Sequence, residues 1–453
     1  MKKALKVSAL CIIVVFLIAT LSIIGCKTTT ATTTAAETTT AAETTAAETT
    51  TAATKAVSEE IVLTYSNWQF NEAGKNDQLR ALMAKYQETH PNVKFEEIST
   101  PYNEYEDSLF TRWAAGDSPD LLLIVDITLT RAVAEGHMAA LDEYIDLSKY
   151  SDQFSGVQDF PTMNGHTYGI VAEATTQEMI YNANLFVQAG LDPAKPPTTV
   201  DEFIKDCEAI NALGPDYKGY GVRNSMDQSA GWWSDYGSWA YGFGAKWAVD
   251  GVPTINSPEN VKALTEFKRV YDTGSMTKGV PSATYRKSMS LGQLGFLIDN
   301  NAEVNIYSLE NSPKLKLTTA AAPFPSPNTV TEVCILGVSK DSKHKEEAAK
   351  YIEWYMQPEN NTSIMEEFRS PISVYKQGVS QKWIDANPLF QPFVTGAKTA
   401  FSMVPEGLGL YMGEFRNIVQ SHMETVLLTN VDPQKALDAA QAEVEAMLKQ
   451  KQK

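Results

Sequence analysis

The chain has 453 residues, of which 43% are hydrophobic and 21% charged, and its formal net charge at pH 7 is −17. This acidic balance argues against nucleic acid as a partner, because phosphate backbones bind basic surfaces. The length exceeds what a single compact core normally uses, so the sequence predicts two packed units.

The N-terminus has the pattern of an export signal. Three lysines precede an apolar run over residues 9–24 that is short for a membrane span. The run ends in Gly25 and Cys26, which resembles the lipobox of bacterial lipoproteins. The resemblance implies that residues 1–25 are a signal peptide and that Cys26 is lipidated. An uncleaved anchor helix with an incidental cysteine is the alternative.

Residues 26–58 follow as a linker whose composition is almost entirely Thr, Ala and Glu. With so few bulky apolar side chains, this segment buries too little surface to offset the entropy of ordering. It predicts a disordered tether with a reach of roughly 30 Å. A Thr-rich glycosylated stalk would serve the same purpose.

The next part of the chain alternates between strand and helix patterns. Strands are expected at 61–66, 93–98 and 120–125, and amphipathic helices at 76–89 and 102–115. The run at 120–125 is continuously apolar, as in a parallel strand buried on both faces. This β-α-β-α-β order predicts a doubly wound lobe.

Ligands of open α/β sheets collect beyond the carboxyl ends of the strands. Asn67 and Trp68 follow the first predicted strand, and Asp126 follows the third. All three are therefore candidate ligand-binding residues. Packing is the alternative role for Trp68, and helix capping is the alternative for Asp126.

The stretch over residues 164–203 connects one packed unit to the next. It opens on a turn at Gly165, continues extended from 168 to 174, and includes a short helix that ends at Gly190. Thr199 then begins a helix with a capping-box spacing. The chain is thus predicted to leave one unit through a strand and to start a second.

The same stretch resembles the extracellular solute-binding proteins of ABC importers, family 1, the sugar-binding group. The order of short motifs, rather than any single one, carries the resemblance. The matching residues are Asn164, Gly165, Tyr168, Gly169, Tyr181, Asn182, Ala189, Gly190, Leu191, Pro196, Pro197, Thr199, Asp201, Glu202 and Phe203.

The second unit is expected to contain strands at 220–222, 294–298 and 315–319 and a capped helix at 260–272. A further strand is expected at 333–338. Helices at 301–309, 345–356, 414–428 and 433–449 complete the pattern. The resemblance places the last two on the second lobe.

The resemblance implies an α/β, two-lobed periplasmic-binding-protein-like fold of type II, with doubly wound lobes joined by a three-crossing hinge. The crossings are expected near 170–174, 333–337 and 370–373. The first lobe would then comprise residues 59–170 and 338–370, and the second lobe residues 174–333 and 374–453.

The resemblance also adds candidate binding residues. Glu173 lies where a relative has a carboxylate that binds sugar hydroxyls, and a hinge salt bridge is the alternative. Trp232 and Trp233 precede a helix that abuts the cleft in the family, with core packing as the alternative. Asp299 and Asn300 follow a predicted strand, at a point where the family often has an aromatic residue.

No catalytic motif, metal-ligand spacing or cofactor motif is present in the sequence, and Cys207 and Cys334 are expected to be free thiols. The resulting hypothesis is a monomeric, non-enzymatic receptor, lipid-anchored on the extracytoplasmic face of the cell membrane. It would bind a carbohydrate, in particular an oligosaccharide, between its lobes and deliver it to an ABC transporter permease. The alternatives are a binder of peptides, polyamines or metal, and a secreted glycoside hydrolase, which would need two carboxylates flanking one bond.

Overall fold

The computed structural model describes residues 59–72, 75–310 and 312–451. The predicted signal peptide, Cys26 and the Thr-rich linker lie outside the described residues. Within the described part, buried side chains form one core from residues 63–174 and 333–384 and further cores from residues 179–330 and 390–448. We call the parts built on these cores the first and the second lobe.

The first lobe has the doubly wound arrangement that the sequence predicts. Parallel strands β1 and β2 pair, and β3 pairs on the other side of β1. Helices connect them, and Gly116 ends α2 with a φ of 73°, a conformation that glycine adopts at low cost. The elements are β1 (Ile61–Ser66), α1 (Lys75–Thr89), β2 (Val93–Ile98), α2 (Tyr102–Ala115), β3 (Leu121–Val125) and α3 (Asp126–Ala134).

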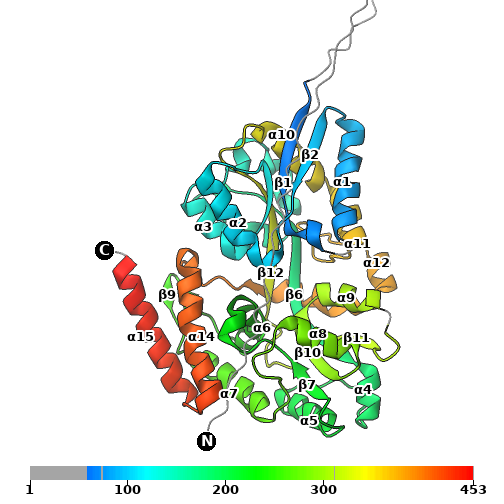
Figure 1. Ribbon diagram of the computed structural model, residues 1–453, viewed down its shortest axis with the longest axis vertical. Helices are drawn as coiled ribbons and strands as arrows, with labels where there is room; N and C mark the ends of the chain where they lie inside the picture. The colour runs from blue at the N-terminus through cyan, green and yellow to red at the C-terminus, as the bar shows by residue number, and fades with distance from the viewer. Residues whose placement is uncertain (1–58, 73–74, 311, 452–453) are drawn as a thin grey trace, which may run out of the picture. The chain divides into compact units, whose positions relative to one another are not determined.

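Two long strands run through both lobes, as Figure 1 shows for β6 (Ile170–Asn182) and β12 (Thr329–Val338). They are antiparallel to each other. Val171 and Ala174 of β6 lie in the first core, while Met179 and Tyr181 lie in the second. The sheet order β2-β1-β3-β12-β6-β10-β7 is therefore continuous across the lobes.

The second lobe begins where β6 continues, and it is richer in helices. Thr199 caps α5 by accepting from the Glu202 N–H, and Ser257 caps α7, whose first residue is Pro258, so both predicted helix starts are confirmed. Its elements up to β12 are α4 (Ala183–Gln188), α5 (Val200–Asn211), β7 (Lys218–Gly221), α6 (Ser229–Gly242), α7 (Pro258–Asp272), α8 (Ser282–Ser290), β10 (Leu294–Asn300), α9 (Ala302–Glu310) and β11 (Leu317–Ala320).

After β12, the chain contributes helices to both lobes. Helix α10 packs on the first core, and α14 and α15 pack on the second, as expected. The elements are α10 (Lys345–Met356), α11 (Pro358–Phe368), α12 (Gln381–Ala386), α13 (Gln391–Gly396), β13 (Ala400–Ser402), α14 (Met412–Thr429) and α15 (Pro433–Lys451).

The predicted third crossing near 370–373 is not a strand. Ile372 makes one isolated bridge with Ala174, and Tyr375 makes another with Phe154. Val374 and Val379 still pack in the first core. The connection is therefore held by single bridges and side-chain packing and not by a hydrogen-bonded ladder.

Cys207 and Cys334 are free thiols, as predicted. Among the helices within residues 59–451 that the structure describes, none combines the length and apolar character that crossing a bilayer requires.

Candidate functional site

The two lobes meet where β6 and β12 pass from one core to the other. Glu173 lies at this point on β6 and is 8% exposed. Its carboxylate accepts from the side-chain amide of Gln69 at 3.0 Å and from Lys75 Nζ at 2.8 Å. The ion pair named above as the alternative role for Glu173 is thus present, and it joins β6 to the N-terminus of α1.

The first lobe contributes an aromatic group at the carboxyl end of β1. Trp68 is buried and meets Tyr102 and Tyr105 edge to face, with ring centroids 5.4 and 5.0 Å away. Tyr102 remains 50% exposed. Trp68 therefore has the packing role, while the ring of Tyr102 is available to a ligand.

Asn67 and Asn300 each cap a short segment. The Asn67 carbonyl oxygen accepts from the Gln69 N–H, and its amide donates to Tyr65 Oη at 3.1 Å. Asn300 accepts from the Ala302 N–H at the start of α9. Both predicted site residues hold the backbone at the carboxyl ends of β1 and β10, and their polar atoms already have partners.

Asp126 connects the lobes. It begins α3 beyond the carboxyl end of β3, and its Oδ2 accepts from the hydroxyl of Ser402 on β13 at 2.9 Å. Its other oxygen, Oδ1, is buried without a hydrogen-bond partner among the described residues. Burial raises the pKa of Asp126 to about 6.

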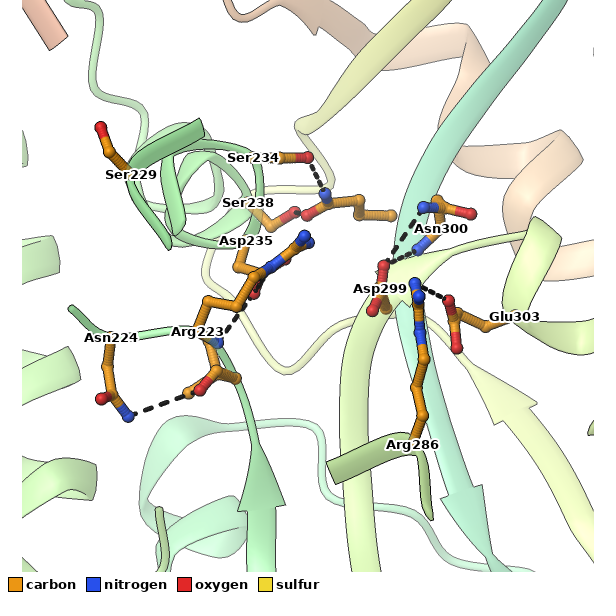
Figure 2. Close-up of polar contacts among 12 residues, drawn as sticks. Arg223, Asn224, Ser229, Ser234, Asp235, Ser238, Arg286, Asp299, Asn300 and Glu303 are labelled. Carbon is orange, nitrogen blue, oxygen red and sulfur yellow. Dashed lines mark hydrogen bonds and ion pairs between the residues drawn. The ribbon is translucent and has the colours of Figure 1, made fainter. Parts of the chain in front are cut away.

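The second lobe presents a cluster of buried charges at the carboxyl ends of β7 and β10 (Figure 2). Arg223 pairs with Asp235, whose Oδ2 accepts from both the backbone N–H and Nε of Arg223 at 2.9 and 2.8 Å. Arg286 pairs with Glu303. Figure 2 shows Arg223 and Arg286 reaching toward Asp299 from either side in this view.

Asp299 is 1% exposed, and its Oδ1 accepts only from the backbone and side-chain amide of Asn300. Burial and the charge of Asp235 raise its pKa, while Arg223 and Arg286 act in the opposite direction. Within the described residues, Asp299 forms no ion pair of its own.

Gln177 of β6 fixes α6. Its amide nitrogen donates to Ser234 Oγ at 2.8 Å, and its amide oxygen accepts from Ser238 Oγ at 2.5 Å. These bonds hold the helix that carries Asp235 against the crossing strand.

Glu332 lies on β12, which pairs with β3 through Cys334 and Val125 and with β6 through Glu332 and Thr175. Burial and the charge of Asp126 raise its pKa to about 7, while Arg223 lowers it. Charges from both lobes therefore act on this one carboxyl. Its side chain makes no hydrogen bond or ion pair to any residue that the structure describes.

Arg416 of α14 borders the same region. Its Nε is buried without a hydrogen-bond partner in the described part of the chain. Burial lowers its pKa, and Glu106 and Tyr102 of the first lobe raise it. Groups of the first lobe therefore act on this cation of the second lobe.

Comparison with known proteins decides the family. Residues 81–392 match the model of the bacterial extracellular solute-binding proteins. The chain belongs to this family.

Two relatives of this solute-binding protein illustrate the sequence similarity. A binding protein of Brucella abortus (strain 2308) is 26% identical over 378 residues, which cover 80% of this chain and 88% of the relative. The sn-glycerol-3-phosphate-binding periplasmic protein UgpB of Escherichia coli (strain K12) is 22% identical over 423 residues, covering 84% and 91%.

Solved structures confirm the two-lobed α/β fold of type II. An ABC transporter solute-binding protein from Thermotoga lettingae, bound to α-D-tagatose, superimposes with a TM-score of 0.75 at 20% identity. It covers 86% of this chain and 100% of that structure. The cyclic α-maltosyl-1,6-maltose-binding protein from Arthrobacter globiformis gives a TM-score of 0.74 at 21% identity, with coverages of 86% and 100%.

The structure places Trp232 and Trp233 in the core of the second lobe. Both are at most 1% exposed. Trp233 stacks on Trp247 at 4.5 Å and donates its N–H to the Met403 carbonyl. The indole N–H of Trp232 is buried without a partner among the described residues. Ligand contact by either tryptophan remains an untested prediction.

Sequence reasoning missed several charged residues of the site. Arg223 follows the carboxyl end of β7, so the rule that selected Asp126 would also have selected it. Glu332 was visible as the one acid in an otherwise apolar strand pattern. No sequence signal marks the residues brought in by tertiary packing, which are Tyr102, Asp235, Arg286, Glu303 and Arg416.

A surface pocket of about 460 Å³ lies elsewhere on the second lobe. It is separate from the interlobe residues and is lined by Asn184, Val187, Gln188, Tyr217, Leu291, Gly292, Gln293, Pro313 and Lys314. No group of three or more potential metal ligands occurs within the part of the chain that the structure describes.

Proposed function

We propose that this solute-binding protein is a receptor that binds a carbohydrate, in particular an oligosaccharide, between its two lobes. The supporting observation is the composition of the interlobe region. The first lobe contributes the half-exposed Tyr102, which packs against Trp68 beyond the carboxyl end of β1, and Asp126 beyond that of β3. The second lobe contributes Arg223 beyond the carboxyl end of β7. Sugars present apolar C–H faces and rims of hydroxyls, so aromatic surfaces and planar polar groups on both lobes suit them.

The mechanism in this proposal is hinge closure. Asp126 and Ser402 already bridge the lobes, and β6 and β12 pass between them. A ligand that contacts both lobes favours the closed state by its differential affinity. We place the hinge at the crossings near 170–174 and 333–337. The predicted third crossing near 370–373 is moved to the connection after Ile384, because residues up to Ile384 pack in the first core and Phe390 packs in the second lobe.

In this proposal the protein delivers its ligand to an ABC transporter permease and performs no chemistry on it. Incubation with chromogenic glycosides tests the second part. Release of the chromophore by the purified protein, lost in a Glu332→Gln variant, would establish a glycosidase instead.

Anchoring through Cys26 is the third part of the proposal. Replacement Cys26→Ser removes the thiol that would carry the lipid, so the variant should leave the membrane fraction and keep its fold. A variant that stays firmly membrane-bound after fractionation would rule out this anchor.

A thermal-shift screen tests ligand class. A ligand that binds only the folded state raises the melting temperature, by an amount that grows with its concentration above Kd. We expect shifts from a panel of mono- and oligosaccharides and none from peptides. Shifts confined to peptides would overturn the proposal.

A further inference from the structure

Three carboxylates at the meeting point of the lobes lack a cationic partner. Asp126, Glu332 and Asp299 form no ion pair with any described residue, although Asp126 and Asp299 are 4% and 1% exposed. Glu332 lies near the start of α3 at Asp126, because Cys334 of β12 is paired with Val125 of β3. Asp299 and Glu332 flank the same strand, since they are paired with Glu178 and Thr175 of β6. Burying charged carboxylates without partners is unfavourable.

The neighbouring cations are already paired. Lys75 pairs with Glu173, Arg223 with Asp235, and Arg286 with Glu303. Arg416 is the exception among the site residues, but the charged groups that act on it are Glu106 and Tyr102. The interlobe region thus carries an excess of negative charge.

Asp126 gives a second indication of a ligand. Its side chain is buried, and one of its two oxygens has a protein partner, Ser402, while Oδ1 has none in the described structure. A buried oxygen without a donor is costly, by about 1 to 3 kcal/mol or more for a charged group. A donor from a bound ligand would satisfy it.

The half-exposed Tyr102 packs against Trp68 beyond the carboxyl end of β1, and the neighbouring strand β3 leads directly into Asp126. The charges of Glu332 and Asp126 raise the pKa of its hydroxyl, and Arg223 lowers it. An aromatic ring beside unpaired carboxylates suits a ligand that combines a C–H face with a positive charge.

We propose that the ligand carries a protonated amine, so that the substrate class is an amino sugar or an oligosaccharide containing one. The ammonium group contacts Asp126 and Glu332, and the sugar ring lies against Tyr102. This inference rests on the carbohydrate-binding function proposed above and specifies its substrate. It disfavours phosphorylated polyols such as the ligand named for the Escherichia coli relative.

The proposal implies a pH dependence. Asp126 is faced by Ser402, Tyr102 and Tyr241, and Glu332 by Asp126, Arg223, Asp299 and Tyr102. Protonation of the carboxyls removes their attraction for an ammonium group. The ligand amine in turn loses its proton as the pH rises past its own pKa, which lies at or below about 8, as for an α-amino group. Affinity should therefore be highest near neutral pH and fall both as the pH is lowered toward 5 and as it is raised above about 8.

The test is calorimetric titration of the detergent-purified full chain with matched pairs of ligands. Chitosan oligosaccharides and their N-acetylated counterparts have the same ring and linkage but differ in charge. We expect the free amines to bind at least tenfold more tightly. Equal or tighter binding of the N-acetylated or other neutral sugars would overturn the amine inference and leave the carbohydrate function intact.

Spermidine and sn-glycerol-3-phosphate complete the panel. Binding of spermidine without any amino sugar would overturn both proposals, because the site would then recognise the amine alone. Binding of the phosphate compound in preference to the amines would overturn the inference and assign the specificity to Arg416.

Two single-residue variants test whether Glu332 is responsible for the preference for amines. Glu332→Gln should reduce amino-sugar affinity at least tenfold and should reduce the preference for the free amines over their N-acetylated counterparts. Glu178→Gln is the control, because Glu178 is a buried carboxyl of the same strand system whose partner is the Ala322 N–H. An equal loss of amino-sugar affinity in both variants would contradict the proposal, and so would an unchanged affinity in Glu332→Gln.

Discussion

At the residue scale, Glu173 shows how one carboxylate holds the first lobe to a crossing strand. Its oxygens accept from Gln69 and Lys75, and the side chains of Lys75 and Glu173 are only 18% and 11% exposed. Lys75 also lies 4.6 Å from the ring centroid of Phe368. Removing the negative charge would therefore leave a nearly buried ammonium group without its anion.

Glu173→Gln is expected to lower the free energy of unfolding by about 1.5 to 3 kcal/mol, the range for hydrogen bonds to charged groups. Urea denaturation measures the change. Glu97→Gln is the matched control, since its pair with Arg80 is more exposed and is expected to contribute less than about 1 kcal/mol. Equal effects would show that burial of the Lys75 pair does not stabilise the fold.

At the element scale, the strands and capped helices were predictable because each depends on local pattern. The apolar run that became β3 and the Ser257–Pro258 start of α7 are examples. The length of β6 was underestimated, since pairing with β12, β10 and β11 extends it. The aromatic cluster in α6 gave no sign of whether Trp232 and Trp233 face a core or a ligand, because that depends on tertiary packing.

The close approach of β12 to the residue before β6 gives a prediction. A Cβ on Gly169 would lie 2.5 Å from Ile335 Cγ2 and 2.7 Å from the Leu336 carbonyl oxygen. Gly169→Ala should therefore destabilise the protein by about 1 to 3 kcal/mol. Gly413→Ala, in helix α14 with nothing within 4 Å of the new Cβ, should be neutral or stabilising by up to about 1 kcal/mol. Thermal denaturation compares the two, and a neutral Gly169→Ala would refute the packing argument.

At the scale of the whole molecule, buried carboxyls make stability depend on pH. Burial raises the pKa of Asp126 to about 6, of Glu332 to about 7 and of Glu178 to about 8. Groups with a raised pKa in the folded state stabilise it fully below their unfolded pKa, near 4, and this contribution is lost as the pH rises through the folded value.

The ligand-free protein is thus expected to lose stability between about pH 4 and about pH 8, measured as the urea midpoint. The free energy of unfolding should fall less over this range in Glu178→Gln than in the parent, by more than about 1 kcal/mol. The reason is that a shift of one pKa unit corresponds to about 1.4 kcal/mol. A midpoint that stays constant or rises over this range would contradict the account of these groups.

The central claim is that the ligand binds between the lobes and not in the surface pocket. Calorimetric titration of the parent, Tyr102→Ala and Gln188→Ala with the sugar that gives the largest thermal shift tests it directly. Tyr102 is half-exposed at the interlobe region, and Gln188 lines the pocket. The account predicts that Tyr102→Ala weakens binding by roughly 1 to 3 kcal/mol and that Gln188→Ala binds like the parent. Loss of affinity in Gln188→Ala with Tyr102→Ala unchanged would contradict it.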